Sequence, residues 1–95
     1  MDIVTSNNSI TITGNIKTVM DYQTIKENID TVVETHQKIS IHIVDSISMT
    51  SSIIGYFNKL ILKDKIQVDM KVSNEQLLEL LEDLNLTALF HVTKG

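Results

Sequence analysis

The stretch from Ile39 to Leu62 constrains the fold most, because it passes from a strand pattern through a hydroxyl-rich turn into a helix pattern. The β-branched run Ile39–Val44 is typical of a strand that is buried on both faces of a sheet. The turn that follows offers several hydroxyl groups as N-caps for a helix from about Ser52 to Leu62. A strand, a capped turn and a helix make half of a βαβ unit, so we expect any functional site at this turn.

Two elements before this segment and one after it can be placed by the spacing of their apolar residues. Asp2–Thr13 contains two β-branched runs around the turn signal Ser6–Ser9, which predicts an edge hairpin that ends at Gly14. Thr18–Asp21 resembles a capping box and predicts the start of a helix. The apolar face of that helix consists of Ile25, Ile29, Val32, Val33 and His36. Ile66–Val72 alternates strictly, which indicates a half-exposed strand.

The last quarter of the chain predicts a leucine-rich helix and a short final segment. Ser73, followed by Gln76 three residues later, has the spacing of a capping box and predicts the start of this helix. The leucines that we expect in the core are Leu77, Leu78, Leu80, Leu81 and Leu84. Leu89–Val92 predicts a last short strand or an extended tail.

The order of these elements is β-β-α-β-α-β-α, with an optional terminal strand, and it predicts an α/β fold in one domain, residues 1–95. Strands that are separated by helices favour right-handed crossovers and a mostly parallel sheet. We therefore expect a mixed sheet of four or five strands, with three main helices largely on one face and Ile39–Val44 in the centre.

Composition argues against several classes of function. The 95 residues carry a net charge of −4, which argues against non-specific nucleic-acid binding. All basic residues are lysines, so no guanidinium is present to clamp a phosphate, and the absence of cysteine excludes disulfides and thiolate metal sites. The N-terminus lacks the pattern of a signal peptide, and no apolar run approaches the ~18 residues of a membrane span. We expect a cytoplasmic protein.

No catalytic, metal or cofactor motif can be recognised. Glycines occur singly, so there is no glycine-rich phosphate loop, and His36, His42 and His91 lack the spacing of a metal pair. A pairing of Ser51 with a histidine stays open as a basis for a serine-dependent hydrolase, although the G-x-S-x-G elbow is missing. We predict that the chain is not an enzyme and holds no cofactor.

Several features together resemble the STAS family, the sulfate-transporter and anti-sigma-factor-antagonist domain. Gly14 ends the hairpin, and Met49–Gly55 (M-T-S-S-I-I-G) occupies the place of the family's D-S-S-G-L-G-type turn. Val72–Phe90 is similar to the family's closing leucine-rich helix and its L-x-x-L-F tail. The resemblance spans nearly the whole chain. Two positions depart from the family pattern, where Thr50 replaces an acidic residue and Ile53 replaces a glycine.

This resemblance implies a non-catalytic regulatory module similar to an anti-sigma factor antagonist. Its partner would be a serine-kinase-type anti-sigma factor or related regulator, which would hold ATP. Ser51 matches the serine that the kinase phosphorylates, ahead of Ser52 and Thr50. An alternative within the family is the small STAS subunit that docks on the ATPase of a lipid-transport ABC system.

The expected partner surface combines the turn with the outward side of the second helix. We assign Ile54, Phe57 and Ile61 to the core side of that helix, so that Tyr56 faces outward as the main anchor. The full set of expected contact residues is Met49, Thr50, Ser51, Ser52, Tyr56, Asn58 and Lys59.

Overall fold

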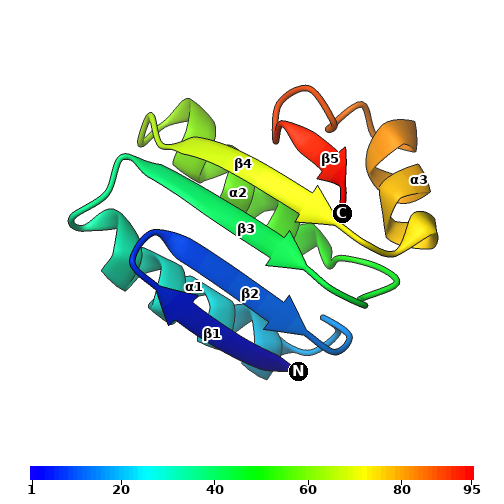
Figure 1. Ribbon diagram of the computed structural model, residues 1–95, viewed down its shortest axis with the longest axis horizontal. Helices are drawn as coiled ribbons and strands as arrows, with labels where there is room; N and C mark the ends of the chain where they lie inside the picture. The colour runs from blue at the N-terminus through cyan, green and yellow to red at the C-terminus, as the bar shows by residue number, and fades with distance from the viewer.

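The computed structural model describes all residues, Met1–Gly95, as a five-stranded mixed sheet with three helices. The strands are β1 (Asp2–Ser6), β2 (Ser9–Thr13), β3 (Lys38–Ile43), β4 (Gln67–Val72) and β5 (Val92–Lys94). The helices are α1 (Val19–Val33), α2 (Ser51–Leu62) and α3 (Glu75–Asp83). The sheet order is β1-β2-β3-β4-β5, which confirms the expected order of elements and the central place of β3 (Figure 1).

The N-terminal hairpin forms the antiparallel part of the sheet. β1 pairs with β2 in an unbroken register from Asp2–Thr13 to Ser6–Ser9, and every later pairing is parallel. Asn7 lies in the turn at φ 54°, the left-handed region that asparagine tolerates. Gly14 ends β2 at φ 87°, where a Cβ atom would lie only 2.9 Å from Cα of Met1. The expected edge hairpin is confirmed.

One face of the sheet carries the core, and the other face is open. Ile39, Ile41 and Ile43 of β3 are fully buried, whereas Ser40 and His42 between them lie on the open face. The expectation that β3 is buried on both faces is therefore wrong. Alternating apolar and polar residues place one set on each face, and α1 and α2 cover only one of them (Figure 1).

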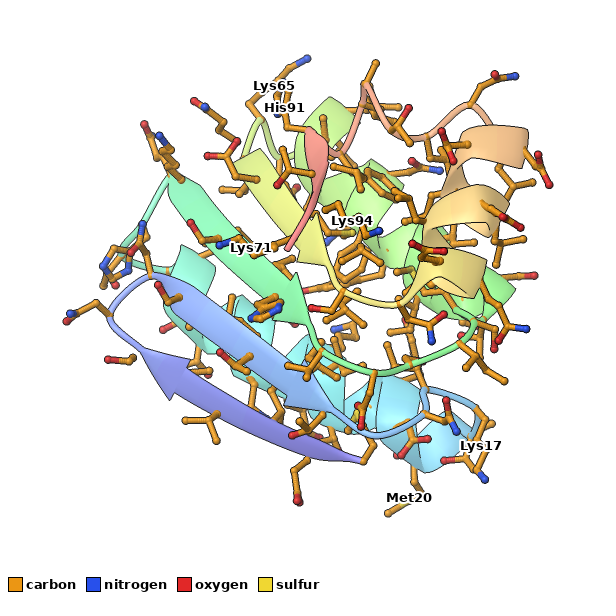
Figure 2. The ribbon with its side chains drawn as sticks, turned by 45° about the vertical axis from the view of Figure 1, so that its right-hand side comes forward. Lys17, Met20, Lys65, Lys71, His91 and Lys94 are labelled. Atoms are coloured by element: carbon orange, nitrogen blue, oxygen red, sulfur yellow. The ribbon has the colours of Figure 1, made fainter.

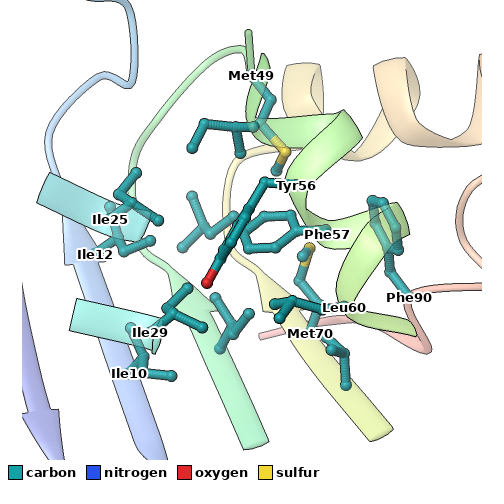
Figure 3. Close-up of a cluster of buried hydrophobic side chains, with 14 of the residues drawn as sticks. Ile10, Ile12, Ile25, Ile29, Met49, Tyr56, Phe57, Leu60, Met70 and Phe90 are labelled. Atoms are coloured by element: carbon teal, nitrogen blue, oxygen red, sulfur yellow. The ribbon is translucent and has the colours of Figure 1, made fainter. Parts of the chain in front are cut away.

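The core combines the inner face of the sheet with apolar residues from all three helices (Figure 3). Within it, Phe57 of α2 and Phe90 pack edge to face, with ring centroids 5.8 Å apart. None of the three helices has the length and apolar character that a bilayer span requires.

Helix α1 begins as its sequence predicts. The backbone N–H of Asp21 donates to Oγ1 of Thr18 at 3.0 Å, and the N–H of Thr18 donates back to Oδ2 of Asp21 at 3.1 Å. These reciprocal bonds satisfy donors that the helix itself leaves free. The capping box is confirmed.

Helix α3 begins differently from the prediction. Its N-cap is Asn74, whose Oδ1 accepts from the N–H of Leu77 at 3.1 Å. Ser73 is not the cap, because its hydroxyl lies 2.9 Å from Nε2 of His42 on the neighbouring strand. Its predicted capping box with Gln76 is therefore wrong, although the helix itself is present.

The leucine stripe of α3 is only partly core. Leu77 and Leu81 are buried, and Leu78 and Leu80 are half-buried against the core. Leu84 lies at the C-cap and is about half exposed, so its assignment to the core is wrong.

The last strand begins later than the sequence predicts. Residues Thr87–His91 form turns, in which the N–H of Phe90 donates to the carbonyl of Leu86 at 3.0 Å. This turn directs Phe90 into the core, and β5 starts only at Val92.

Candidate functional site

The turn before α2 is tied to the loop that follows β2. The backbone N–H of Gly14 donates to Oδ1 of Asp45 at 2.6 Å, and the N–H of Ile47 donates to Oδ1 of Asn15 at 3.0 Å. Because β2 and β3 are parallel neighbours, both loops leave the same end of the sheet. The two loops therefore form one continuous surface.

Ser46 links the two loops through buried hydrogen bonds of its side chain. It is fully buried, and its hydroxyl accepts from the N–H of Ile16 at 3.0 Å while donating to the carbonyl of Ser48 at 2.7 Å. Both roles of the hydroxyl are used, so the buried group is satisfied. Sequence reasoning missed this residue, because nothing in the local pattern separates it from the exposed hydroxyl residues beside it.

Thr50 is the N-cap of α2. Its Oγ1 accepts from the N–H of Ile53 at 3.3 Å, and its carbonyl accepts the first helical bond, from Ile54, at 3.1 Å. Its side chain is half-buried. The hydroxyl of Thr50 is therefore used in starting the helix.

Ser51 and Ser52 are the first two residues of α2, and both side chains are exposed. No hydrogen bond within the protein engages either hydroxyl. The expected position and exposure of Ser51 are confirmed, while its role as a phosphoacceptor stays a prediction. The first turn of α2 has no acidic residue, so the positive end of the helix dipole is not neutralised there.

The buried face of α2 is rotated relative to the predicted one. Its fully buried residues are Ile53, Tyr56, Phe57 and Leu60, whereas Ile54 and Ile61 are half-buried. Apolar residues occur nearly all around this helix, so their spacing fits two overlapping faces equally well.

Two expected contact residues therefore lie in the core. Tyr56 is only 4% exposed and Met49 is also buried, so the expectation that they face a partner is wrong. Figure 3 shows the ring of Tyr56 facing the isoleucines of β2 and α1, with Met49 beside it near the start of α2.

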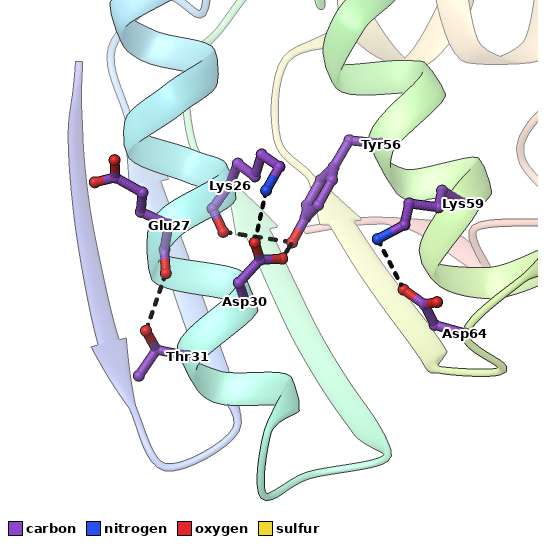
Figure 4. A network of polar contacts seen from close by, with 7 residues as sticks. All are labelled: Lys26, Glu27, Asp30, Thr31, Tyr56, Lys59 and Asp64. Atoms are coloured by element: carbon purple, nitrogen blue, oxygen red, sulfur yellow. Dashed lines mark hydrogen bonds and ion pairs between the residues drawn. The ribbon is translucent and has the colours of Figure 1, made fainter.

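Tyr56 is accommodated by a polar contact between α2 and α1 (Figure 4). Its hydroxyl donates to Oδ1 of Asp30 at 2.5 Å, and Lys26 Nζ lies 2.8 Å from Oδ2 of the same carboxylate. Burial opposes ionisation of Asp30, but the hydrogen bonds from Lys26 and Tyr56 outweigh it and hold the pKa of this carboxyl below its usual value. Burial, and then the bond to Asp30, raise the pKa of the Tyr56 hydroxyl far above its usual value.

The remaining expected contacts lie farther along α2. Lys59 is exposed, and its ammonium lies 3.2 Å from Oδ2 of Asp64 (Figure 4). Asn58 is half-buried, and its Oδ1 is enclosed without a hydrogen-bond partner. Of the expected surface, only Ser51, Ser52 and Lys59 are exposed.

Three exposed apolar residues near the turn were not predicted. Val19 is 73% exposed, Met20 69% and Ile47 49%. Val19 and Met20 open α1 directly after the loop that bonds to Ile47, and Figure 2 shows Met20 and Lys17 projecting from this end of the molecule. The sequence did contain a signal for this exposure: Val19 and Met20 do not have the helical spacing that places Ile25 and Ile29 on the buried face of α1. We call Val19, Met20, Ile47, Ser51 and Ser52 the loop-end surface.

A separate hollow of about 470 Å³ lies on the open face of the sheet. A row of side chains in register crosses it, and this row consists of Thr11, His42, Lys71 and Thr93. None of the predicted site residues lines it.

The histidines have partners away from Ser51. His42 contacts Ser73, and Nδ1 of His91 lies 2.8 Å from the carbonyl of Val68. Nδ1 of His36 lies 3.0 Å from the carbonyl of Val32. No group of three or more histidine and carboxylate side chains is placed to hold a metal ion.

No family model, curated protein or solved structure matches the chain. The function of the chain is therefore inferred from the geometry of the loop-end surface and of α2.

Proposed function

We propose that this chain is a non-catalytic, cytoplasmic interaction module that acts like an anti-sigma factor antagonist. It binds a serine-kinase-type regulator through the loop-end surface, and the partner phosphorylates Ser51. The observation that carries the proposal is the exposed, unengaged hydroxyl of Ser51 at the start of α2, on the same chain segment as the exposed Ile47.

The helix start favours a phosphate on Ser51. The free N–H groups and the dipole of a helix N-terminus stabilise a negative group, and the first turn of α2 has no competing carboxylate. Thr50 already caps the helix, so modification of Ser51 removes no capping bond. A phosphate would add a charge of roughly −2 to the loop-end surface and would repel an acidic partner.

The phosphate would come from ATP that the partner holds. Oγ of Ser51 would attack the γ-phosphorus, the bond to the β,γ-bridging oxygen would break, and ADP would leave as the hydroxyl proton passes to the kinase. The chain has no arginine and no glycine-rich loop with which to bind ATP itself, which supports placing the nucleotide on the partner.

The apolar contacts with the partner are assigned to Val19, Met20 and Ile47, because Tyr56 is buried. Exposed apolar residues that are grouped at one end of a fold favour a protein interface. Lys17 projects from the same end of the molecule as Met20 and offers a cation to an acidic partner (Figure 2).

Affinity capture with wild-type chain as bait, followed by mass spectrometry, tests the proposal. We expect capture of a serine-kinase-type regulator, loss of that capture for Ser51→Asp, and phosphate on Ser51 after incubation with the captured protein and ATP. Capture of an ABC-transporter ATPase that is indifferent to Ser51→Asp would assign the chain to the alternative. Labelling of Ser51 by a serine-reactive probe would instead support a hydrolase.

A further inference from the structure

The outer edge of β1 is unpaired, and most of the usual protection of an edge strand is missing from it. β1 is the terminal strand of the sheet, and its residues are D-I-V-T-S. Edge strands are usually protected by lysine, by proline, by a bulge or by a covering element. β1 has neither lysine nor proline, and its register with β2 is continuous, without a bulge.

The hydrogen bonds of β2 show which backbone groups of β1 point outward. The carbonyls of Asn8 and Ile12 accept from β3 and its continuation, so Ser9, Thr11 and Thr13 direct their backbone groups toward β1. These three residues stand opposite Ser6, Val4 and Asp2. The N–H and C=O groups of Ile3 and Thr5 therefore point away from the sheet.

We propose that β1 pairs antiparallel with β1 of a second copy of this chain, with Val4 on the two-fold axis. Ile3 then stands opposite Thr5 of the second copy, and the two residues exchange both of their hydrogen bonds. This register pairs every residue of β1, and a two-fold axis at any other residue leaves part of the strand unmatched. The result is one sheet that continues through both copies.

The side chains of β1 fit this arrangement. Val4 is 65% exposed on the open face, and at the axis it packs against its own copy. A pair of residues that exchange no hydrogen bonds brings side chains closest in an antiparallel ladder, so this contact covers apolar surface efficiently. Asp2 is the only charged residue of the strand, and it stands opposite Ser6 of the second copy, away from the other Asp2.

The pairing is independent of the proposed function. Ser51 follows β3, which β2 separates from β1, so Ser51 remains free in the dimer (Figure 1). An interface built on one five-residue strand is small, and we expect association to depend on concentration.

Cysteine cross-linking tests the register, since the chain contains no cysteine of its own. We expect Val4→Cys to form a disulfide-linked dimer under mild oxidation, because opposed residues of this kind lie within the range of Cα separations that a disulfide spans. Asp2→Cys is the matched control, since its two copies would lie about 13 Å apart along the strands. A mixture of Asp2→Cys and Ser6→Cys should cross-link as a heterodimer. Equal cross-linking of Asp2→Cys alone and Val4→Cys would overturn the proposal.

Sedimentation equilibrium from micromolar to millimolar concentration tests association without a cross-link. We expect wild type to dimerise, and Val4→Lys to weaken the dimer at least about tenfold because it places two like charges at the axis. Leu62→Lys, which changes a similarly exposed apolar residue on α2, should dimerise like wild type. Circular dichroism verifies that each variant is folded. A chain that remains monomeric throughout this range would also overturn the proposal.

Discussion

The hydroxyl of Tyr56 donates to Oδ1 of Asp30 at 2.5 Å, and this bond joins the two helices that cover the sheet. It explains why a polar aromatic residue faces the core. The ring fills apolar space beside Phe57, and the polar end reaches a carboxylate at the edge of α1 that Lys26 also contacts.

Removing only the hydroxyl tests the weight of this bond. We expect Tyr56→Phe to lower the free energy of unfolding by about 1–2 kcal/mol, since a hydrogen bond to a charged but partly solvated group is lost. Urea denaturation measures the change. Tyr22→Phe is the matched control, because no hydrogen bond to the Tyr22 hydroxyl is present, and it should change stability by less than about 0.5 kcal/mol. Equal effects of the two variants would contradict the assigned role of the bond.

Asp30 should make stability depend on pH in the acid range. Its pKa is lower in the folded protein than in the unfolded chain, so the stabilisation is present above about pH 4 and is lost as pH falls through the folded pKa. We therefore expect the stability difference between wild type and Asp30→Asn to shrink below about pH 4. Thermal melts across this range measure it, and a difference that is independent of pH would contradict the prediction.

Ser51→Asp should separate binding from folding. We expect affinity for the partner to fall at least about tenfold, because negative charge enters the docking surface. The melting temperature should stay the same or rise slightly, since a carboxylate in the first turn interacts favourably with the helix dipole. Ser51→Ala should bind like wild type. An Asp variant that binds as tightly as wild type, or phosphate mapped to another residue, would reject the switch and leave docking to be tested separately.

The apolar part of the loop-end surface can be tested without disturbing the core. We expect Met20→Glu to weaken partner binding about tenfold while the helix tolerates a carboxylate in its first turn. Leu62→Ser removes an exposed apolar side chain at the other end of α2 and should leave affinity unchanged. Isothermal titration with the captured partner compares them, and equal affinities for both variants would place the interface elsewhere.

The one-sided core predicts opposite responses at adjacent faces of β3. Ile43→Asp buries an unpaired charge and should cost about 3–5 kcal/mol, which leaves little folded protein. Ser40→Lys lies on the open face in register with Asp69 and should change stability by less than about 0.5 kcal/mol. Chemical denaturation of both variants distinguishes the faces. A severe loss of stability for Ser40→Lys would show that the open face is packed.

Local patterns predicted the elements whose structure is determined locally. The turn residue Asn7, the capping residues Thr18 and Asp21, and the alternation of β4 needed no distant partner to be recognised. The exposure of Ser51 also followed from its place in the turn, because a helix N-terminus on the surface leaves its first side chains in solvent.

The sequence-based predictions were wrong where two local structures were equally compatible with the sequence and a tertiary contact determined which one formed. Ser73 and Asn74 are both good caps, and His42 on another strand engages Ser73. Tyr56 faces inward because Asp30, twenty-six positions earlier, meets its hydroxyl. The loop-end surface depends in the same way on the contact between Asn15 and Ile47, which no local pattern contains.

The cap of α2 has a consequence for how this molecule would transmit information. Thr50 makes the capping bond of α2, and Ser51 is the residue after it. The residue that we propose to be phosphorylated therefore contributes no side-chain hydrogen bond to the helix start. A phosphate could be added and removed over many cycles while the backbone stays in place. The partner would then respond to the added negative charge, while the shape of the surface that it contacts stays the same.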